Sequence, residues 1–370
     1  MGKGADMGVK RSRVIIVSMF LLFFGMSLWC MGKPREDISA GERRRLADFP
    51  DLTLDTVLDG TFMERFESYA ADQFPLREDF RRLNSVFQFQ VLQKKEVDEI
   101  YLAGGHAAKL SYRIDREAVA RWLKQFSYIY DRYVENGRAY ISVIPDKSCF
   151  LAEESDCPAL DYRQFAELFW QGTEEFATYI NLEEALSLEN FYRTDLHWKQ
   201  ETLRGAADCI ADGMGVSVSH DYKLQELKHP FYGVYYGQAA LPLKPDSIRY
   251  FTGEEIDSLV VTCYDAGEAE NLPVYDMEKA FGRDAYEMFL SGSRALLTIE
   301  NPNCHDHREL VLFRDSFGSS LAPLLAGGYS KITLVDIRYI AQEMLGEFVD
   351  FEGADVLFLY HMQVLNTPKA

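Results

Sequence analysis

The chain has 370 residues, of which 47% are hydrophobic and 14% are aromatic. This composition supplies a large core and excludes an intrinsically disordered protein. The formal net charge is −19, although residues 1–13 carry four basic groups and one acidic group. A body this acidic argues against nucleic acid, or an anionic lipid surface, as the partner of its surface.

An uncharged run of 19 residues, 14–32, follows the basic start. As a helix it would be roughly 28 Å long, close to the hydrocarbon thickness of a bilayer. The basic residues before it predict a cytoplasmic tail over 1–13 and an extracytoplasmic location for everything after residue 32. We therefore predict a single-pass protein of the cell membrane, held by a transmembrane signal anchor over 14–32. An anchor is favoured over a cleaved signal peptide because no A-x-A site follows the apolar run.

The next part of the chain changes from polar to patterned sequence. Residues 33–48 are polar and charged and predict a linker, so that one extracytoplasmic domain would cover 49–370. Apolar residues at helical spacing predict helices over about 59–72 and 76–94, separated at Pro75.

Helical and strand patterns then alternate. A helix over 116–136, a buried strand over 139–144 and a helix over about 162–181 give the rhythm of an α/β protein with a mainly parallel sheet. Continuous apolar runs predict further buried strands of the same sheet. They lie near residues 311–314, 332–335 and 355–360.

Residues 220–300 differ from the rest because apolar runs are short and the helical period is weak. We interpret this stretch as an irregular, mostly β insertion that could wall a cleft. The aromatic, turn-rich segment 231–237 would offer tyrosine rings suited to the faces of sugar rings. A β-meander core is the alternative interpretation.

A serine follows the buried strand near 311–314. Asp315-Ser316-Phe317-Gly318 predicts a sharp turn into an apolar helix. The Ser316 hydroxyl would then lie at the C-terminal end of the strand and in front of a helix N-terminus, where open α/β sheets bind their ligands. The alternative is an ordinary turn in which the serine caps the helix.

An acid and an imidazole, Asp195 and His197, lie two residues apart within the segment 191–198. A serine nucleophile needs a base, and the base needs an acid that fixes its tautomer. Asp195, His197 and Ser316 are therefore the predicted catalytic set. Asp195 is also an acceptable helix cap, which is the structural alternative for this residue.

The cysteines and histidines predict no metal site. Five cysteines lie after the predicted anchor, and this odd number leaves at least one unpaired. Cys149 and Cys157 are close enough to bridge, but unpaired core thiols are favoured. There is no C-x-x-C spacing, and His305-Asp306-His307 is predicted to be a solvated turn, so neither a metal nor another cofactor is expected.

Several short motifs together resemble the DHHW family and its relatives, the alginate O-acetylation proteins with an SGNH-hydrolase-like domain. The resemblance runs from about residue 42 to 366. It is carried by Asp72-Gln73-Phe74-Pro75-Leu76-Arg77, Val143-Ile144-Pro145-Asp146-Lys147, Tyr192-Arg193-Thr194-Asp195-Leu196-His197-Trp198, Asp315-Ser316-Phe317 and Asp336-Ile337-Arg338. It implies an SGNH-hydrolase-like three-layer sandwich and a catalytic Asp-x-His with a serine, here Asp195, His197 and Ser316.

This chain departs from the family pattern in two places. The name-giving motif has histidine where Leu196 stands, although its outer Asp and His are present. The separate Gly and Asn blocks of typical SGNH enzymes are not recognisable. The backbone N–H of Ser316 is then the natural oxyanion donor, and Arg338 and Tyr192 are further candidates for oxyanion or substrate binding.

The function that the resemblance implies is O-acetylation of a cell-surface or secreted polysaccharide through an acyl-enzyme. A carbohydrate O-acetyl esterase with the same triad and a non-catalytic glycan-binding or assembly protein are the alternatives. Acetyl-coenzyme A is cytoplasmic, and one apolar helix cannot conduct a charged thioester. The resemblance therefore implies a membrane-bound O-acyltransferase as a partner that supplies acetyl groups.

Overall fold

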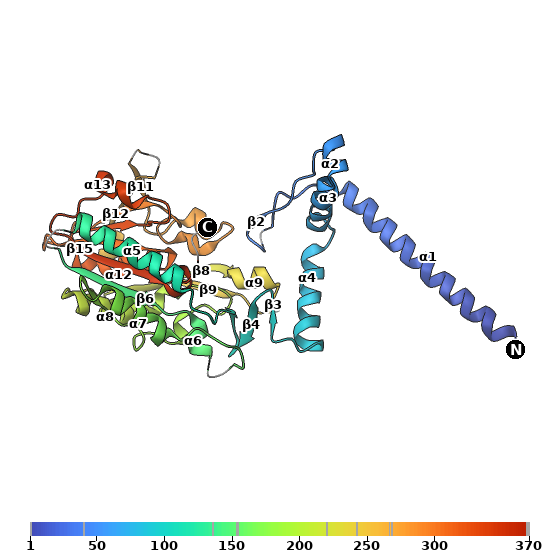
Figure 1. The fold of residues 1–370 in the computed structure, drawn as a ribbon, viewed down its shortest axis with the longest axis horizontal. Coiled ribbons are helices and arrows are strands. Elements are labelled where there is room, and N and C mark those ends of the chain that lie inside the picture. The colour runs from blue at the N-terminus through green and yellow to red at the C-terminus, as the bar shows by residue number, and fades with distance from the viewer. Residues whose placement is uncertain are drawn as a thin grey trace. The chain divides into compact units, whose positions relative to one another are not determined.

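The structure is a computed structural model that describes residues 2–39, 41–134, 137–152, 155–219, 221–241, 243–265, 267 and 269–367. The chain forms two compact units, Met1–Leu92 and Gln93–Ala370 (Figure 1). Compactness alone does not define an independently folding domain. The predicted boundary at residue 49 therefore stays a prediction.

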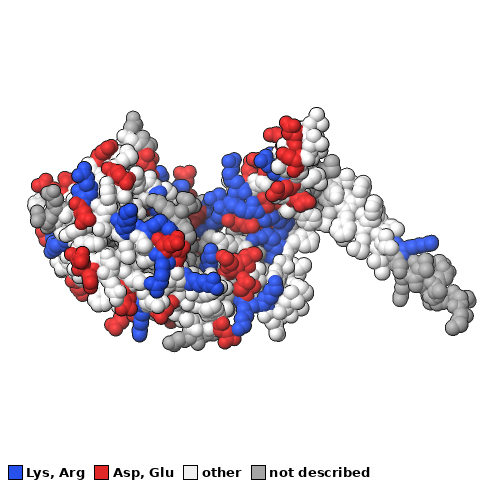
Figure 2. All heavy atoms as spheres, viewed as in Figure 1, with Lys and Arg blue, Asp and Glu red and all other residues white. Residues whose placement is uncertain are grey.

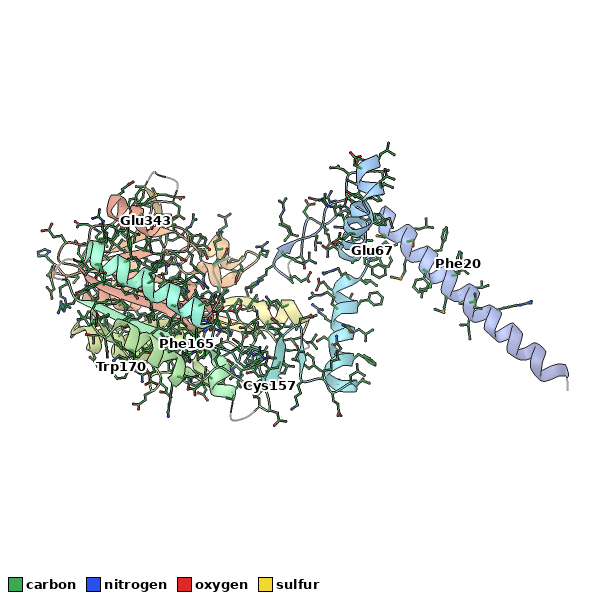
Figure 3. All side chains as sticks on the ribbon, viewed as in Figure 1. Phe20, Glu67, Cys157, Phe165, Trp170 and Glu343 are labelled. Carbon is green, nitrogen blue, oxygen red and sulfur yellow. The ribbon has the colours of Figure 1, made fainter. Side chains whose placement is uncertain are left out.

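The first unit begins with α1 (Gly2–Gly32). Its window Arg13–Cys30 has a mean hydropathy of 2.0 and no buried residue, and within the described chain no other helix is long and apolar enough to cross a membrane. Figure 3 shows Phe20 projecting from this helix, where 70% of its surface is exposed. The helix covers the whole segment 14–32 predicted as an anchor, and the apolar window covers most of it.

The rest of the first unit consists of short elements after α1. They are β1 (Ile38–Ser39), β2 (Arg44–Arg45), α2 (Leu54–Leu58), α3 (Thr61–Asp72), α4 (Arg77–Val86) and the π-helical turn η1 (Phe87–Val91). Asp72, at the end of α3, accepts two hydrogen bonds from the Arg44 guanidinium at 2.6 and 2.8 Å and one from the Ala47 N–H at 2.8 Å. These bonds explain why a carboxylate is buried there, and they tie the segment predicted as a linker to α3.

The second unit is built on an eight-stranded sheet. Its strands are β6 (Ala139–Ile144), β7 (Ala177–Tyr179), β10 (Val260–Cys263), β11 (Glu270–Leu272), β12 (Leu296–Glu300), β13 (Glu309–Arg314), β14 (Lys331–Val335) and β15 (Asp355–His361). They lie in the order β11-β10-β12-β14-β13-β15-β6-β7. The strands from β14 to β7 run parallel, so the predicted mainly parallel sheet with four adjacent strands is confirmed.

Helices cover both faces of this sheet. They are α5 (Arg116–Tyr133) and α7 (Tyr162–Thr173) on one face, and α8 (Arg204–Met214) and α12 (Ser316–Leu325) on the other. Along β13, Val311 and Phe313 pack in the first helical layer, while Leu310 and Leu312 pack in the second. This period of two on a strand that is apolar throughout is the signature of a sheet buried on both faces.

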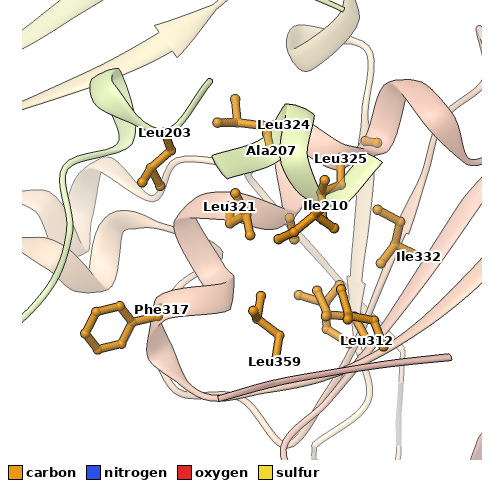
Figure 4. Packing of buried hydrophobic residues seen from close by; sticks show 14 of the residues in the cluster. Leu203, Ala207, Ile210, Leu312, Phe317, Leu321, Leu324, Leu325, Ile332 and Leu359 are labelled. Carbon is orange, nitrogen blue, oxygen red and sulfur yellow. The ribbon is translucent and has the colours of Figure 1, made fainter. Parts of the chain in front are cut away.

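The second core layer is seen at close range in Figure 4. Side chains of α8 and α12 meet over the sheet, and the strands contribute leucine and isoleucine from below. The labelled residues are Leu203, Ala207, Ile210, Leu312, Phe317, Leu321, Leu324, Leu325, Ile332 and Leu359. The predicted three-layer α/β architecture is therefore present.

The stretch 220–300 forms a separate two-stranded sheet and also adds strands to one edge of the eight-stranded sheet. β8 (Lys223–Phe231) and β9 (Asp246–Thr252) form a separate antiparallel pair with a bulge. The strands β10, β11 and β12 instead extend the main sheet with antiparallel pairing. They have three to five residues each, which is too short for a clear periodic signal.

Smaller elements complete the second unit. They are the sheet of β3 (Glu96–Val97), β4 (Ile100–Ala103) and β5 (His106–Lys109), the helices α6 (Lys147–Leu151), α9 (Val234–Ala239), α10 (Glu254–Asp257), α11 (Met277–Ala280), α13 (Leu345–Phe348) and α14 (Met362–Leu365), and the 3₁₀ turns η2 (Leu188–Asn190), η3 (Gln200–Thr202), η4 (Ala285–Met288), η5 (Ala326–Gly328) and η6 (Gln342–Met344). All six cysteines are free thiols, but of the five after the anchor, which were expected in the core, only Cys263 is buried. On the face seen in Figure 2, acidic side chains are scattered over this unit with basic ones between them.

Candidate active site

The predicted nucleophile lies where β13 ends. Asp315 caps α12, because its Oδ1 accepts a hydrogen bond from the Phe317 N–H at 3.0 Å. Its Oδ2 accepts the N–H of His361, at the end of the neighbouring strand β15, at 2.7 Å. Ser316 is the first residue of α12 and is partly exposed. Its hydroxyl therefore lies at the C-terminal end of a central parallel strand, as predicted.

The acid and the base come from a tight loop closed by the antiparallel bridge between Phe191 and Trp198. His197 Nδ1 lies 2.6 Å from Asp195 Oδ1, and His197 Nε2 lies 2.8 Å from Ser316 Oγ. An ionised carboxylate can only accept, so Nδ1 carries a proton, and in the neutral imidazole Nε2 then accepts the serine hydroxyl. The structure thus brings the three predicted residues into one hydrogen-bonded chain.

A buried lysine fixes the backbone of this loop. Lys147 Nζ donates to the carbonyl oxygens of Asp195 at 2.6 Å and Tyr192 at 2.9 Å. Its side chain is fully buried, and this burial lowers the pKa of Lys147 to about 8, although nearby carboxylates such as Asp146 oppose the shift. The ammonium group therefore holds the loop from below at neutral pH.

The β8–β9 region fixes the acid from the other side. The Val234 N–H donates to Asp195 Oδ2 at 2.7 Å, which leaves Oδ1 for the histidine. Asp246 on β9 accepts from the Thr194 N–H at 2.8 Å and the Thr194 hydroxyl at 2.6 Å. Thr194 Oγ1 in turn accepts the Gly233 N–H at 3.0 Å. These supporting contacts lie far apart in the sequence and were not predicted.

The first turn of α12 holds the candidate donors for an oxyanion. The N–H groups of Phe317 and Gly318 are both engaged by Asp315, through its side chain at 3.0 Å and its carbonyl oxygen at 3.1 Å. The Ser316 N–H precedes them and points to the helix N-terminus, where the macrodipole favours negative charge. It remains the best donor for an oxyanion.

The two further candidates have other roles in the structure. Arg338 binds Asp336 through two hydrogen bonds, at 2.9 Å and 2.6 Å, and no contact of its guanidinium with Ser316 or His197 is found within the described chain. Tyr192 has no exposed surface, and its ring packs against Phe231 with 4.9 Å between centroids. The prediction of substrate contact by Tyr192 is therefore corrected, because the ring faces the core beneath the loop.

No group of three or more metal-ligating side chains occurs among the residues that the structure describes. His305, Asp306 and His307 are exposed in a loop, in agreement with the predicted solvated turn. The chemistry that this site supports is nucleophilic catalysis by a serine with an imidazole base.

No family model and no curated protein matches the sequence. Solved structures do match. A DHHW family protein from Eubacterium siraeum aligns with a TM-score of 0.58 and 18% identity over 74% of this chain and 94% of that chain. PatB1 from Bacillus cereus aligns with a TM-score of 0.56 and 14% identity over 73% of this chain and 98% of that chain.

The O-acetyltransferase domain of Pseudomonas putida AlgJ aligns more weakly, with a TM-score of 0.43 and 11% identity over 74% of this chain and 94% of that chain. At such low identities, these matches concern the fold. The resemblance to the DHHW family that the motifs indicated is confirmed at this level.

Replacing Gly233 by Ala should disrupt the acid loop. A Cβ atom at this position would overlap the Thr194 carbonyl oxygen and Asp195 Cβ, so backbone must move. We expect a loss of roughly 1–3 kcal/mol in the free energy of unfolding, as for other overpacked sites, and slower labelling of Ser316 by a sulfonyl fluoride. Gly205→Ala is the control, because its Cβ would lie 3.8 Å from the Ala185 carbonyl oxygen, an ordinary van der Waals contact. Wild-type stability and labelling in Gly233→Ala would contradict the role of this contact.

Proposed function

We propose that this protein is an extracytoplasmic O-acetyltransferase that modifies a cell-surface or secreted polysaccharide through an acyl-enzyme on Ser316. The observation that carries the proposal is the continuous chain of hydrogen bonds from Asp195 through His197 to the Ser316 hydroxyl. A serine in this setting, at a helix N-terminus and next to an imidazole that a carboxylate orients, is equipped for acyl transfer.

The reaction would proceed in two halves. His197 Nε2 takes the hydroxyl proton while Ser316 Oγ attacks the acetyl carbonyl carbon, and the Ser316 N–H stabilises the negative oxygen. The imidazolium then returns the proton to the leaving group, which departs from the acetyl-enzyme. In the second half His197 deprotonates a sugar hydroxyl, whose oxygen attacks the acetyl-enzyme. The bond between the acetyl carbon and Ser316 Oγ then breaks, and the imidazolium returns the proton to Ser316 Oγ. Asp195 holds the imidazole tautomer that both halves need.

A transferase and an esterase share the first half-reaction and differ only in the acceptor of the acetyl group. The geometry of the triad therefore supports both. The motif resemblance to alginate O-acetylation proteins supports the transferase. A non-catalytic glycan-binding protein has no need for a partly exposed serine at 2.8 Å from an oriented imidazole.

Ser316→Ala should abolish turnover of an activated acetyl ester and leave the fold intact, because the hydroxyl faces His197 rather than the core. A sulfonyl fluoride should label wild-type protein at Ser316, and a sulfonyl adduct is recorded in a structure of the fold neighbour PatB1. His197→Ala should slow the labelling by roughly 10²–10⁴-fold, the usual contribution of a general base.

Peptide mass spectrometry locates the label, and the unfolding midpoint checks the fold. Ser330→Ala is the matched control, since its hydroxyl donates to the Arg308 carbonyl oxygen at 3.0 Å, away from the triad. Full turnover in Ser316→Ala would refute a serine-dependent enzyme, and loss of folding would indicate a structural role for this serine.

The acceptor can be identified with the full-length protein in detergent. With an activated acetyl ester and oligosaccharides of different composition, a transferase should form acetylated sugar, and release of its leaving group should accelerate with the correct acceptor. The measurement is mass spectrometry of the sugar together with the rate of leaving-group release. Acetate release that no sugar changes would favour the esterase instead.

An outer location of the triad would require a partner protein in the membrane that supplies the acetyl group. We propose that α1 anchors the protein in the cell membrane with the triad on the outer side, where cytoplasmic acetyl-coenzyme A does not reach it. A multi-spanning membrane-bound O-acyltransferase would carry the acetyl group across. Tethering by α1 would raise the effective concentration of the triad at the outer face of that partner.

Deleting such a membrane acyltransferase from the source cells should remove surface acetylation as completely as Ser316→Ala does, because the two proteins would act in series. The measurement is the acetate content of the purified surface polysaccharide. Complementation with the deleted gene is the control. Acetylation that persists without any membrane acyltransferase would refute the partnership and favour the esterase.

A further inference from the structure

The base of the proposed triad lies flat against a buried tyrosine. The rings of His197 and Tyr286 are stacked, with 3.9 Å between centroids and 13° between planes. Tyr286 belongs to η4 and retains only 4% of its surface exposed. On another side Phe317, next to the nucleophile, lies 4.9 Å from the imidazole centroid at an angle of 45°. The imidazole is therefore confined by aromatic rings as well as by its two hydrogen bonds.

The hydroxyl of Tyr286 reaches the helix that carries the nucleophile. Tyr286 Oη lies 2.8 Å from Oγ of Ser320, which is one turn after Ser316 on α12. Burial raises the pKa of Tyr286 well above its usual value, so the phenol keeps its proton. The Trp198 indole N–H also donates to Ser320 Oγ, at 2.8 Å, and Ser320 donates to the Phe317 carbonyl oxygen at 3.3 Å.

The chemistry of the partners limits the direction of these bonds. An indole nitrogen can only donate, and a carbonyl oxygen can only accept. The Trp198 N–H is shared between Ser320 Oγ and the Phe317 carbonyl oxygen, which lies at 3.1 Å. The Ser320 hydroxyl can donate to the same carbonyl oxygen, and either hydroxyl can donate in the bond between Tyr286 and Ser320. Ser320 thus connects Trp198, the Tyr286 ring that stacks on His197, and α12, which carries Ser316.

We propose that Tyr286 and Ser320 are positioning residues that hold the His197 imidazole in line with the Ser316 hydroxyl. The proposal rests on the proposed function of Ser316 and His197 as nucleophile and base. Neither residue touches the reacting atoms. Tyr286 restrains rotation of the imidazole about its side-chain bonds, and Ser320 ties that restraint to α12.

The restraint has a chemical consequence for the acyl-transfer cycle. His197 must accept a proton from one oxygen and deliver it to another without losing alignment, and proton transfer needs heavy atoms within about 2.6–3.2 Å. The face of a phenol also attracts the imidazolium that forms in each half-reaction. A ring that stays in place therefore supports both halves of the reaction.

The test compares Tyr286→Phe, Tyr286→Leu and Ser320→Ala in the full-length protein in detergent. Three quantities are measured: the second-order rate constant for labelling of Ser316 by a sulfonyl fluoride, and kcat and KM for an activated acetyl ester. Tyr286→Leu removes the stacked ring and should lower the labelling rate and kcat by roughly 10- to 100-fold, the cost of a small misplacement in an active site. KM should be unchanged, because no substrate contact is lost.

Tyr286→Phe keeps the ring and should recover most of the rate, and Ser320→Ala should fall between the two other variants. Tyr329→Phe is the matched control, because it removes another buried hydroxyl, bonded to Asp355 Oδ2 at 3.3 Å at the start of β15. It should label at the wild-type rate. Tyr286→Phe and Ser320→Ala keep the test valid if Tyr286→Leu does not fold.

The outcomes separate the two proposals. Labelling of Tyr286→Leu and Ser320→Ala at the wild-type rate would overturn the positioning role while leaving the triad in place. A raised KM with unchanged kcat would also overturn it and make Tyr286 a substrate-binding residue. If wild-type protein is neither labelled at Ser316 nor active on the ester, the proposed function itself fails.

Discussion

One buried carboxylate, that of Asp315, determines where the serine points. Its two oxygens accept the N–H groups of Phe317 and His361, and they join the first turn of α12 to the end of the neighbouring strand β15. A carboxylate with no exposed surface is stable only when such donors replace its hydration. The chain direction at Ser316 is thus fixed relative to the central strands of the sheet.

The acid and the base depend on a different kind of support. Their loop contains no regular strand or helix, so its shape is imposed by Lys147 from below and by Asp246 and Val234 from the side. Leaving one of these buried partners unpaired costs about 1–3 kcal/mol, more for a charged group. The loop is therefore stable in one conformation, the one in which Asp195 faces the imidazole.

The sequence predicted what is encoded locally. The strands β6, β13, β14 and β15 are continuous apolar runs, and the triad residues stand in short motifs whose chemistry is evident. The strands β7, β10 and β11 have three or four residues and become strands only by pairing with neighbours. Gly233, Asp246 and Tyr286 act through contacts with residues 39, 52 and 89 positions away. One signal was available for Lys147, which lies two residues after Pro145 and therefore just beyond the end of an apolar strand.

The loop that carries His197 and the helix that carries Ser316 are joined by hydrogen bonds at Ser320. These bonds therefore set the distance between the base and the nucleophile. Trp198 and Gln200, which follow the base in the sequence, both donate hydrogen bonds to Ser320. The Trp198 indole N–H donates to Ser320 Oγ and the Gln200 amide N–H donates to the Ser320 carbonyl oxygen, both at 2.8 Å. Gln200 also accepts the Phe251 N–H at 2.9 Å, which adds β9 to the same junction. A buried network of this kind is favourable only when each donor and acceptor is paired. Because the donors and acceptors around Ser320 are paired, the network connects the loop to α12 and to the sheet. This connection keeps the distance between His197 and Ser316 fixed.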